Sequence, residues 1–200
     1  METAALADEL LAAWDEARLI ELPSAKPGGL ALAQAFEVAD VIRARRIARG
    51  DAPRGYKIGF TNRTIWPRYG VFRPMWSHVW DRTVAHAAND AAALDVSRLH
   101  EPRVEPEIVL GLASPPPAQG DARAILDAVA WIAAGFEIVH SIFPGWKFRA
   151  PDCTAAFGLH GLLVVGTPVP VAPGDRDRLA AMLPSFTVTL RRSGTVVDTG

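Results

Sequence analysis

The stretch Val104-Glu-Pro-Glu-Ile-Val-Leu-Gly-Leu112 combines the alternation of a β-strand with two closely spaced carboxylates. Residues two apart in a strand point the same way, so Glu105 and Glu107 would be neighbours on one face, with Ile108 and Leu110 on the other. Two adjacent, partly buried carboxylates stay ionised together only when a cation lies between them. Oxygen ligands suit a hard ion such as Mg²⁺ or Mn²⁺. The alternative is a strand that begins at the surface, with both glutamates solvated.

A third carboxylate lies in the next apolar strand pattern, Phe136-Glu-Ile-Val-His-Ser141. Glu137 shares a face with Val139 and opposes Phe136 and Ile138. A carboxylate in such surroundings is either paired with a cation or shifted in pKa. A salt bridge to one of the arginines is the alternative to a metal ligand.

Two further charged residues could take part in chemistry. Lys57, in Gly55-Tyr-Lys-Ile-Gly59, could extend its ammonium group to solvent, or it could face a carboxylate substrate or transfer a proton. Asp152 follows Ala150-Pro151 and is either a general base or a turn residue. The histidines are scattered, with no spacing typical of a zinc site; they are His78, His86, His100, His140 and His160.

The order of elements predicts an α+β fold. Apolar periodicity indicates a helix that includes Leu6, Leu10, Trp14 and Ala17. A second helix is expected from about Leu32 to Arg49, ending in a solvated basic turn before Gly50. Asp121 is expected to cap a helix that runs through Ala134. Strands are expected at Tyr56–Phe60, Val104–Leu112, Phe136–Ile142 and Gly161–Val165, and a hairpin at Phe186–Leu190 and Thr195–Val197.

Length and charge exclude several classes of protein. The chain has 200 residues with 21 Lys and Arg against 22 Asp and Glu, so nucleic acid and anionic membranes are not expected partners. Its single cysteine excludes an internal disulfide framework and, with no targeting or membrane-spanning segment recognised, favours the cytoplasm. One domain over residues 1–200 is expected, with a helical part at 1–50 and a sheet-rich body at 51–200.

Taken together, these segments resemble the 2-keto-4-pentenoate hydratase and 4-oxalocrotonate decarboxylase group of the fumarylacetoacetate hydrolase superfamily. The resemblance rests on Gly55-Tyr-Lys-Ile-Gly-Phe-Thr-Asn62, on Arg103-Val-Glu-Pro-Glu-Ile108, and on Gly135-Phe-Glu-Ile-Val-His-Ser141 followed by Trp146-Lys147 and Asp152. It covers about residues 30–200 in the family order. The resemblance implies a mixed β-roll preceded by helices.

The resemblance also implies roles for individual residues. Glu105, Glu107 and Glu137 match the ligands of a divalent metal, Mg²⁺ or Mn²⁺. Lys57 matches a lysine that faces the substrate, and Asp152 matches an acidic position after the third ligand. A substrate-binding Asp81 is the last expectation, since it lies near a family loop of the pattern Pro-Asp-aromatic-Gly.

The sequence departs from the family pattern at two places. Pro74-Met75-Trp76-Ser77 replaces that loop, and Ala156-Phe157 replaces an Asp-Asn pair. Family members usually continue beyond the equivalent of Gly200, so a C-terminally truncated β-roll, lacking its last strands, is expected.

The function implied is a hydro-lyase of aromatic-compound catabolism that adds water to a 2-hydroxy-dienoate or 2-oxo-enoate through an enolate stabilised by the metal. Lys57 would hold the substrate carboxylate or donate a proton, and Asp152 would activate the water. A 4-oxalocrotonate-type decarboxylase or an acylpyruvate hydrolase is the alternative with the same metal. A non-catalytic subunit that supports an active relative is the alternative of another class. A homo-oligomer with a small 2-oxo acid substrate is expected.

Overall fold

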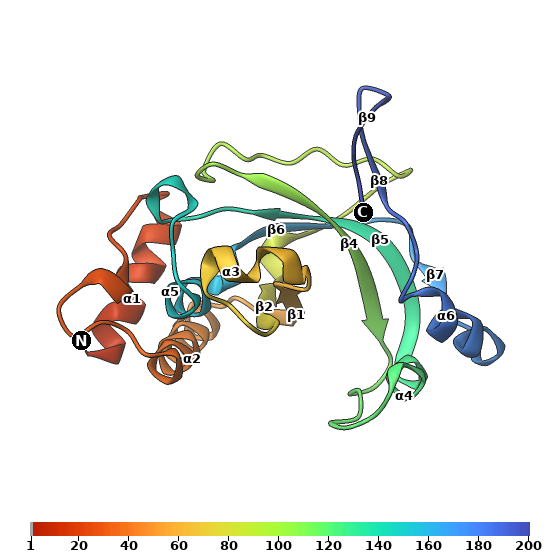
Figure 1. Ribbon diagram of the computed structural model, residues 1–200, viewed down its shortest axis with the longest axis horizontal. Helices are drawn as coiled ribbons and strands as arrows, with labels where there is room; N and C mark the ends of the chain where they lie inside the picture. Colours follow the sequence, from red (N-terminus) through yellow and green to blue (C-terminus); the bar gives the residue numbers. More distant parts are fainter. Residues whose placement is uncertain (1) are drawn as a thin grey trace. The chain divides into compact units, whose positions relative to one another are not determined.

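The computed structural model describes residues 2–200, which form two compact units that interleave along the chain. The first unit holds the chain up to Val84 together with Ala93–Val104 and Glu137–Leu163. The second unit holds Ala85–Ala92, Glu105–Phe136 and Val164–Gly200. The strands β4 (Arg103–Leu112) and β5 (Val129–Val139), labelled in Figure 1, supply residues to both units.

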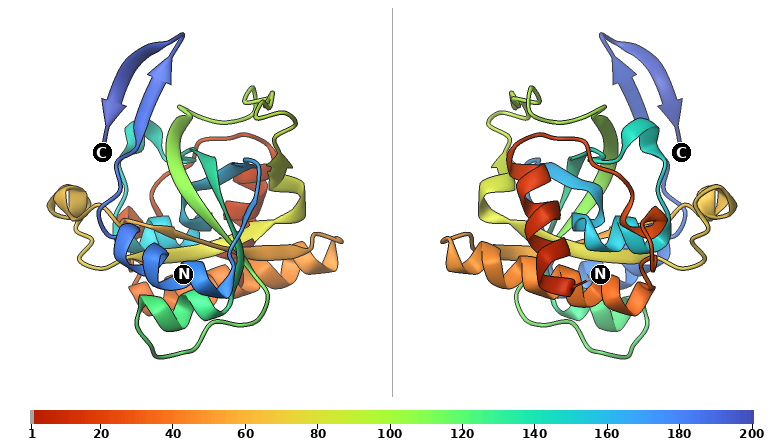
Figure 2. Two further views of the ribbon diagram at one scale, coloured as in Figure 1. Left: turned by 90° about the vertical axis from the view of Figure 1, so that its right-hand side faces the viewer. Right: turned by 90° about the vertical axis from the view of Figure 1, so that its left-hand side faces the viewer.

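Helices surround the core of the first unit. They are α1 (Thr3–Asp15), α2 (Leu32–Ala48), α3 (Trp66–Tyr69) and α5 (Ala150–Ala155). α2 packs against both α1 and α5, as the two views of Figure 2 also show. Leu6 and Leu10 of α1 and Val38 and Ile42 of α2 are buried in this core. Both predicted helices are confirmed, although α1 ends before Ala17.

The basic end of α2 differs from expectation at one residue. Arg46 is buried rather than solvated, and its guanidinium lies over the rings of Trp14 and Trp80. Its Nε is 2.9 Å from a carboxylate oxygen of Asp51, which is also buried. A buried arginine is tolerated here because the carboxylate and the two aromatic faces replace water. Gly50 ends the helix with φ of 94°, as predicted.

Lys57 lies in a two-stranded antiparallel sheet of the first unit. The sheet pairs β1 (Pro53–Gly59) with β2 (Met75–Trp80), and Lys57 lies opposite Ser77. The usual burial pattern of a strand is inverted in β1. Tyr56 and Ile58 are 66% and 61% exposed, whereas the Lys57 side chain is only 10% exposed.

The larger sheet has five strands in the order β3-β6-β5-β4, and β7 also pairs with β5. Their bounds are β3 (Val84–His86), β4 (Arg103–Leu112), β5 (Val129–Val139), β6 (His160–Val165) and β7 (Val169–Pro170). The predicted strands at 104–112 and 161–165 are confirmed. The second unit also contains α4 (Ala122–Asp127), α6 (Arg176–Met182) and the hairpin of β8 (Thr189–Arg192) and β9 (Thr195–Thr199).

The remaining regular segments are single 3₁₀ turns. These are η1 (Pro23–Ala25), η2 (Arg63–Ile65), η3 (Asp81–Thr83), η4 (Pro144–Trp146), η5 (Phe157–Leu159) and η6 (Pro173–Asp175). Within residues 2–200, no helix combines the length and the apolar character needed to cross a membrane.

The helix predicted from Asp121 through Ala134 is wrong in its second half. Asp121 caps α4 as expected, with its side chain accepting from the Ala124 amide, but the helix ends at Asp127. β5 then begins at Val129. Its backbone is held by segments distant in sequence, since Gly166 donates to the Ala134 carbonyl and Val171 to that of Ala130. These long-range hydrogen bonds outweigh the modest helix preference of an alanine-rich segment.

Candidate metal and substrate site

The three predicted carboxylate ligands lie close together. Glu105 and Glu107 project from β4, and Glu137 comes from β5, the neighbouring strand in the sheet. One carboxylate oxygen from each glutamate lies within 4.8 Å of the others. Glu105 is exposed, Glu107 is half-buried and Glu137 is buried. We refer to these residues as the glutamate cluster.

Lys57 forms an ion pair with the buried member of the glutamate cluster. Its Nζ is 2.8 Å from Oε2 of Glu137 and donates to the Gly158 carbonyl at 3.3 Å. Gly158 has φ of 58°, and a Cβ there would lie 2.9 Å from the Cβ of Ser77. A glycine is therefore needed for this carbonyl to approach the lysine. The surrounding chain directs the ammonium group towards Glu137 rather than towards solvent.

Glu137 is also bound by a histidine that the sequence did not single out. His160 Nδ1 is 2.7 Å from Oε1 of Glu137, and His160 Nε2 is 2.8 Å from the hydroxyl of Thr83. Glu137, His160 and Thr83 are all buried. A buried chain of hydrogen bonds thus runs from η3 through β6 to β5.

The charges around Glu137 keep it ionised. Burial by itself raises the pKa of Glu137, but the hydrogen bond from His160 and the charge of Lys57 outweigh burial and hold that pKa below its ordinary value. Burial also lowers the pKa of His160, although Glu137 opposes this effect. At neutral pH the pair is therefore a carboxylate and a neutral imidazole.

A neutral His160 fixes the direction of the hydrogen bonds. The carboxylate of Glu137 can only accept, so Nδ1 of His160 carries the proton and donates. Nε2 must then accept, and the Thr83 hydroxyl, whose other acceptor is the Trp80 carbonyl at 3.0 Å, is the donor within reach at 2.8 Å. The Thr83 oxygen accepts in turn from the Trp80 amide at 3.2 Å.

Asp152 lies in a helix rather than a turn. It is fully buried near the start of α5, and its carboxylate accepts from the Ser24 amide and hydroxyl and from the Arg149 amide at 2.7–2.9 Å. These contacts fasten η1 to the start of α5. Its role as an acid or base stays a prediction.

Asp81 joins the end of β2 to the chain before β1. Its carboxylate accepts from the Ala52 amide at 3.0 Å, and its own amide donates to the Ala52 carbonyl. This pair of bonds closes one end of the β1–β2 sheet. The substrate-binding role of Asp81 stays a prediction.

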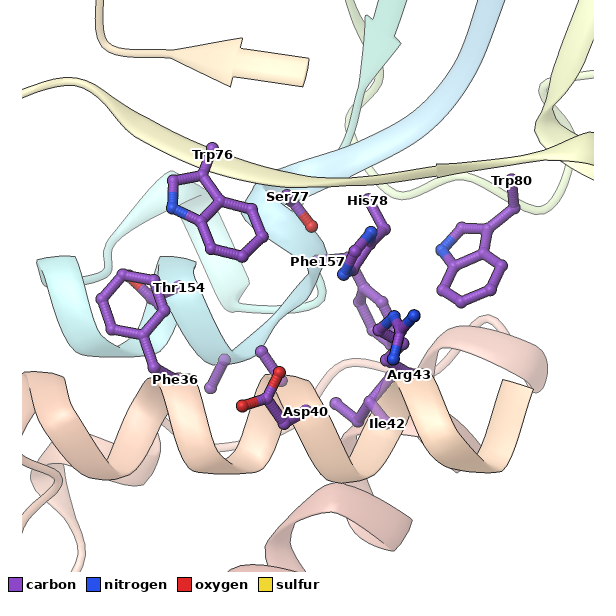
Figure 3. A pocket seen from close by; sticks show the side chains of 12 residues that line it. Phe36, Asp40, Ile42, Arg43, Trp76, Ser77, His78, Trp80, Thr154 and Phe157 are labelled. Atoms are coloured by element: carbon purple, nitrogen blue, oxygen red, sulfur yellow. The ribbon is translucent and has the colours of Figure 1, made fainter. Parts of the chain in front are cut away.

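A pocket lies between α2, β2 and α5, and it is lined by none of the residues predicted to act in the site. Figure 3 shows Trp76, His78 and Trp80 of β2 pointing towards α2, which contributes Phe36 and Arg43. Trp76 and His78 alternate with Ser77, the residue opposite Lys57. The pocket therefore lies largely against the other face of the β1–β2 sheet.

Sequence reasoning did not identify His160 and Thr83. His160 is a polar residue at the start of the apolar strand His160–Val165, and Glu137 is likewise a polar residue in an apolar strand. The same pattern could therefore have identified His160. Sequence spacing does not reveal the role of His160, because its contact with a carboxylate forms only in the fold. Thr83 carries no comparable signal.

The residues present fit a divalent ion. The glutamate cluster supplies only oxygen donors, which is the donor set of Mg²⁺, Ca²⁺ or Mn²⁺. Three carboxylates within 4.8 Å of one another repel unless positive charge lies among them. Lys57 supplies part of that charge at Glu137.

Comparisons with known proteins support the predicted resemblance. No protein-family model matches the chain. The chain is 31% identical over 170 residues to a 2-keto-4-pentenoate hydratase of Paraburkholderia xenovorans strain LB400, an alignment that covers 83% of this chain and 59% of that protein. It is 27% identical over 197 residues to a 2-hydroxypent-2,4-dienoate hydratase of Pseudomonas putida, covering 98% of this chain and 85% of that protein.

The fold has a close counterpart among solved structures. The 4-oxalocrotonate decarboxylase from Pseudomonas putida G7, complexed with magnesium and adipate, superposes with a TM-score of 0.86 at 23% identity. The match covers 99% of this chain and 72% of the decarboxylase. The predicted resemblance and the α+β fold are thereby confirmed. The chain spans 59% of the length of the xenovorans hydratase.

Proposed function

We propose that this chain is a divalent-metal-dependent hydro-lyase that adds water to a 2-hydroxy-dienoate or 2-oxo-enoate, like the 2-keto-4-pentenoate hydratases it resembles. The observation that carries the proposal is the ionised, buried Glu137, which contacts Lys57 and lies beside two more carboxylates. A purely structural sheet gains little from keeping like charges together. Binding of a cation and an anionic substrate would explain why these carboxylates lie together.

The glutamate cluster would hold Mg²⁺ or Mn²⁺ through carboxylate oxygens. When bound, such an ion supplies positive charge that stabilises negative charge developing on a substrate oxygen. Lys57 is fixed between Glu137 and the Gly158 carbonyl, so its ammonium group can hold a substrate carboxylate or deliver a proton at Nζ.

Asp152 would activate the water. Its carboxylate already accepts three hydrogen bonds, which leaves about one of its roughly four acceptor positions for a water molecule. Asp81, bound to the Ala52 amide, would contact the substrate. Both aspartate roles follow from the family resemblance.

Decarboxylation is the second candidate reaction. The observation that favours it is the shared fold with the Pseudomonas putida G7 decarboxylase. Hydration, decarboxylation and acylpyruvate hydrolysis all place negative charge on an oxygen next to a carboxylate, so one set of ligands serves each of them. Product analysis separates them, because decarboxylation releases CO₂ and hydrolysis releases pyruvate. The proposal also includes a cytoplasmic location, a small 2-oxo acid as substrate and a homo-oligomer.

The first experiment measures Mn²⁺ binding by calorimetry, with and without oxalate as a mimic of a 2-oxo acid enolate. We expect Mn²⁺ to bind, oxalate to strengthen binding, and Glu107→Ala to weaken it by at least about tenfold. Glu101→Ala, which changes an exposed glutamate outside the cluster, is the control. A folded wild-type chain that binds no Mn²⁺ would contradict the proposal and favour a non-catalytic subunit.

A further inference from the structure

We propose that His160, held by Thr83, is a positioning residue that presents one chosen oxygen of Glu137 to the divalent ion. The inference rests on the proposed function and extends it to two residues that the family motifs do not include. The side chains that carry it all lie within the first compact unit.

The two oxygens of Glu137 have different partners. Oε1 accepts from His160 Nδ1 at 2.7 Å, and Oε2 lies 2.8 Å from the Lys57 ammonium group. A hydrogen bond to a carboxylate is stronger than one between neutral groups and has a preferred direction. His160 therefore fixes the rotation of the carboxylate and leaves Oε2 as the oxygen that meets a cation. Without this donor, a buried carboxylate could turn or share both oxygens with Lys57.

Thr83 makes the imidazole a dependable donor. The Thr83 hydroxyl accepts from the Trp80 amide at 3.2 Å, and its proton has two acceptors within reach, Nε2 of His160 at 2.8 Å and the Trp80 carbonyl at 3.0 Å. Donation to Nε2, the shorter of the two contacts, makes Nε2 an acceptor and keeps the imidazole proton on Nδ1, where it faces Glu137. In many metal sites a carboxylate orients a histidine ligand. Here a histidine would orient a carboxylate ligand.

A histidine that only filled space would not need this arrangement. The ring is 3% exposed, and both of its nitrogens have polar partners in correct geometry. By contrast, the buried His140 leaves Nδ1 without a hydrogen-bond partner among residues 2–200. His160 is therefore buried with both ring nitrogens hydrogen-bonded, and one of them binds Glu137, the residue that contacts Lys57.

Two pairs of variants test the inference through Mn²⁺ affinity of the metal-stripped full chain, measured by calorimetry. His160→Leu removes the donor, whereas His160→Asn keeps an N–H near the position of Nδ1. Thr83→Val removes the hydroxyl, whereas Thr83→Ser keeps it. We expect His160→Leu to weaken Mn²⁺ binding by about 10- to 100-fold and Thr83→Val to weaken it by a smaller factor. The Asn and Ser variants should stay within about threefold of wild type.

A second readout does not depend on metal. Long-range ¹H–¹⁵N spectra of the metal-free wild type should show His160 as the Nδ1–H tautomer, and Thr83→Val should lose this preference. The tautomer measurement and the Thr83 pair keep the inference testable if His160→Leu does not fold, as judged by circular dichroism.

The outcomes separate this inference from the proposed function. Unchanged Mn²⁺ affinity in folded His160→Leu and Thr83→Val, or an Nε2–H tautomer in the wild type, would overturn the positioning role alone. Equal weakening in Thr83→Val and Thr83→Ser would also overturn it, since shape and not the hydroxyl would then matter. A folded wild type that binds no Mn²⁺ would overturn the proposed function, and this inference with it.

Discussion

Lys57 and Glu137 are charged residues at strand positions that usually carry apolar side chains. The Lys57 side chain is 10% exposed and that of Glu137 is 3% exposed, while Tyr56 and Ile58 beside Lys57 are turned outward. Burying a charged pair costs desolvation energy that its attraction only partly offsets. Such a cost is expected where the charges act on a ligand. If Glu137 holds the metal and Lys57 acts on the substrate, a change at Lys57 should affect turnover and metal binding to different extents.

Lys57→Met should reduce turnover far more than Mn²⁺ affinity. The variant keeps the length of the side chain but loses the ammonium group that would hold substrate or transfer a proton, so we expect turnover of 2-hydroxypent-2,4-dienoate to fall by about 10²- to 10⁴-fold. Mn²⁺ affinity should change little or increase, because a positive charge near Glu137 is removed. Arg192→Met, which removes an exposed positive charge outside the family motifs, is the control. Equal losses of turnover and affinity would show that Lys57 acts mainly on the metal site.

His140 links stability to pH through burial. Burial, with smaller contributions from His100 and His160, lowers the pKa of His140 from 6.5 to about 4. Its ring lies edge-on to Trp14 and is almost inaccessible to solvent. Between pH 6.5 and about 4, His140 is therefore neutral in the folded chain but protonated in the unfolded chain.

The free energy of unfolding should fall as pH decreases from 6.5 towards 4. The unfolded state binds more protons in this window, so His140 removes about 2 kcal/mol of stability at pH 5 relative to pH 7.5. His140→Phe lacks this proton and should lose correspondingly less stability over the same interval. Urea unfolding of both chains at the two pH values, with chelator present, measures the difference. Parallel pH dependences would show that another group controls the acid sensitivity.

At the scale of the element, strand alternation identified β4 and the three glutamates of the cluster. Alternation is a local property, because residues two apart in a strand share a face wherever the strand lies. The first half of β5 was misread, since an alanine-rich segment is compatible with helix and strand alike. Its pairing with β7, Trp131 opposite Pro170 and Ile132 opposite Val169, depends on residues almost 40 positions away.

The contact of His160 with Glu137 and Thr83 was hidden for the same reason. It requires residues 23 and 77 positions apart in the chain to meet in a buried space. The buried Arg46 is a similar case, because its aromatic neighbours Trp14 and Trp80 come from α1 and β2. Sequence patterns show which face of a helix or strand a residue lies on. They do not show which distant residues pack against that face, and the roles of His160 and Arg46 depend on those residues.

Gly111 allows β4 and β5 to share one tightly packed face. A Cβ at Gly111 would lie 1.8 Å from a ring carbon of Trp131, so the indole lies directly against the glycine backbone. Gly111 is an even number of residues from Glu105 and Glu107, and Trp131 from Glu137. The tryptophan and the three glutamates therefore lie on the same face of the sheet.

Gly111→Ala should destabilise the protein by roughly 1–3 kcal/mol, because the added methyl group must displace the Trp131 ring or shift a strand. Gly174→Ala, where a Cβ would meet nothing within 4 Å, should change stability little. Urea unfolding monitored by tryptophan fluorescence compares the two variants. An unchanged midpoint for Gly111→Ala would show that the indole can move without cost.

At the scale of the whole molecule, the opposite face of β4 is apolar and exposed. Ile108, Leu110 and Leu112 are 36%, 39% and 51% exposed, and Phe136 of β5 lies on the same face at 42%. β4 is also the last strand in the order of its sheet, so its outer edge lacks a neighbouring strand among residues 2–200. An exposed strand edge beside an apolar patch favours association with another chain.

The proposed homo-oligomer should therefore depend on the apolar face of β4. We expect light scattering after size exclusion to give a multiple of 21.5 kDa for the wild type. Leu110→Glu should shift the mass towards the monomer, because burying an unpaired carboxylate in an interface costs several kcal/mol. Leu19→Glu changes a leucine that is similarly exposed, at 42%, in the first unit, and it should leave the mass unchanged. A monomeric wild type would contradict oligomerisation, whereas dissociation by Leu19→Glu alone would place the interface on the first unit. Because Leu110 points away from the glutamate cluster, Mn²⁺ affinity of the Leu110→Glu monomer also tells whether the metal site depends on assembly.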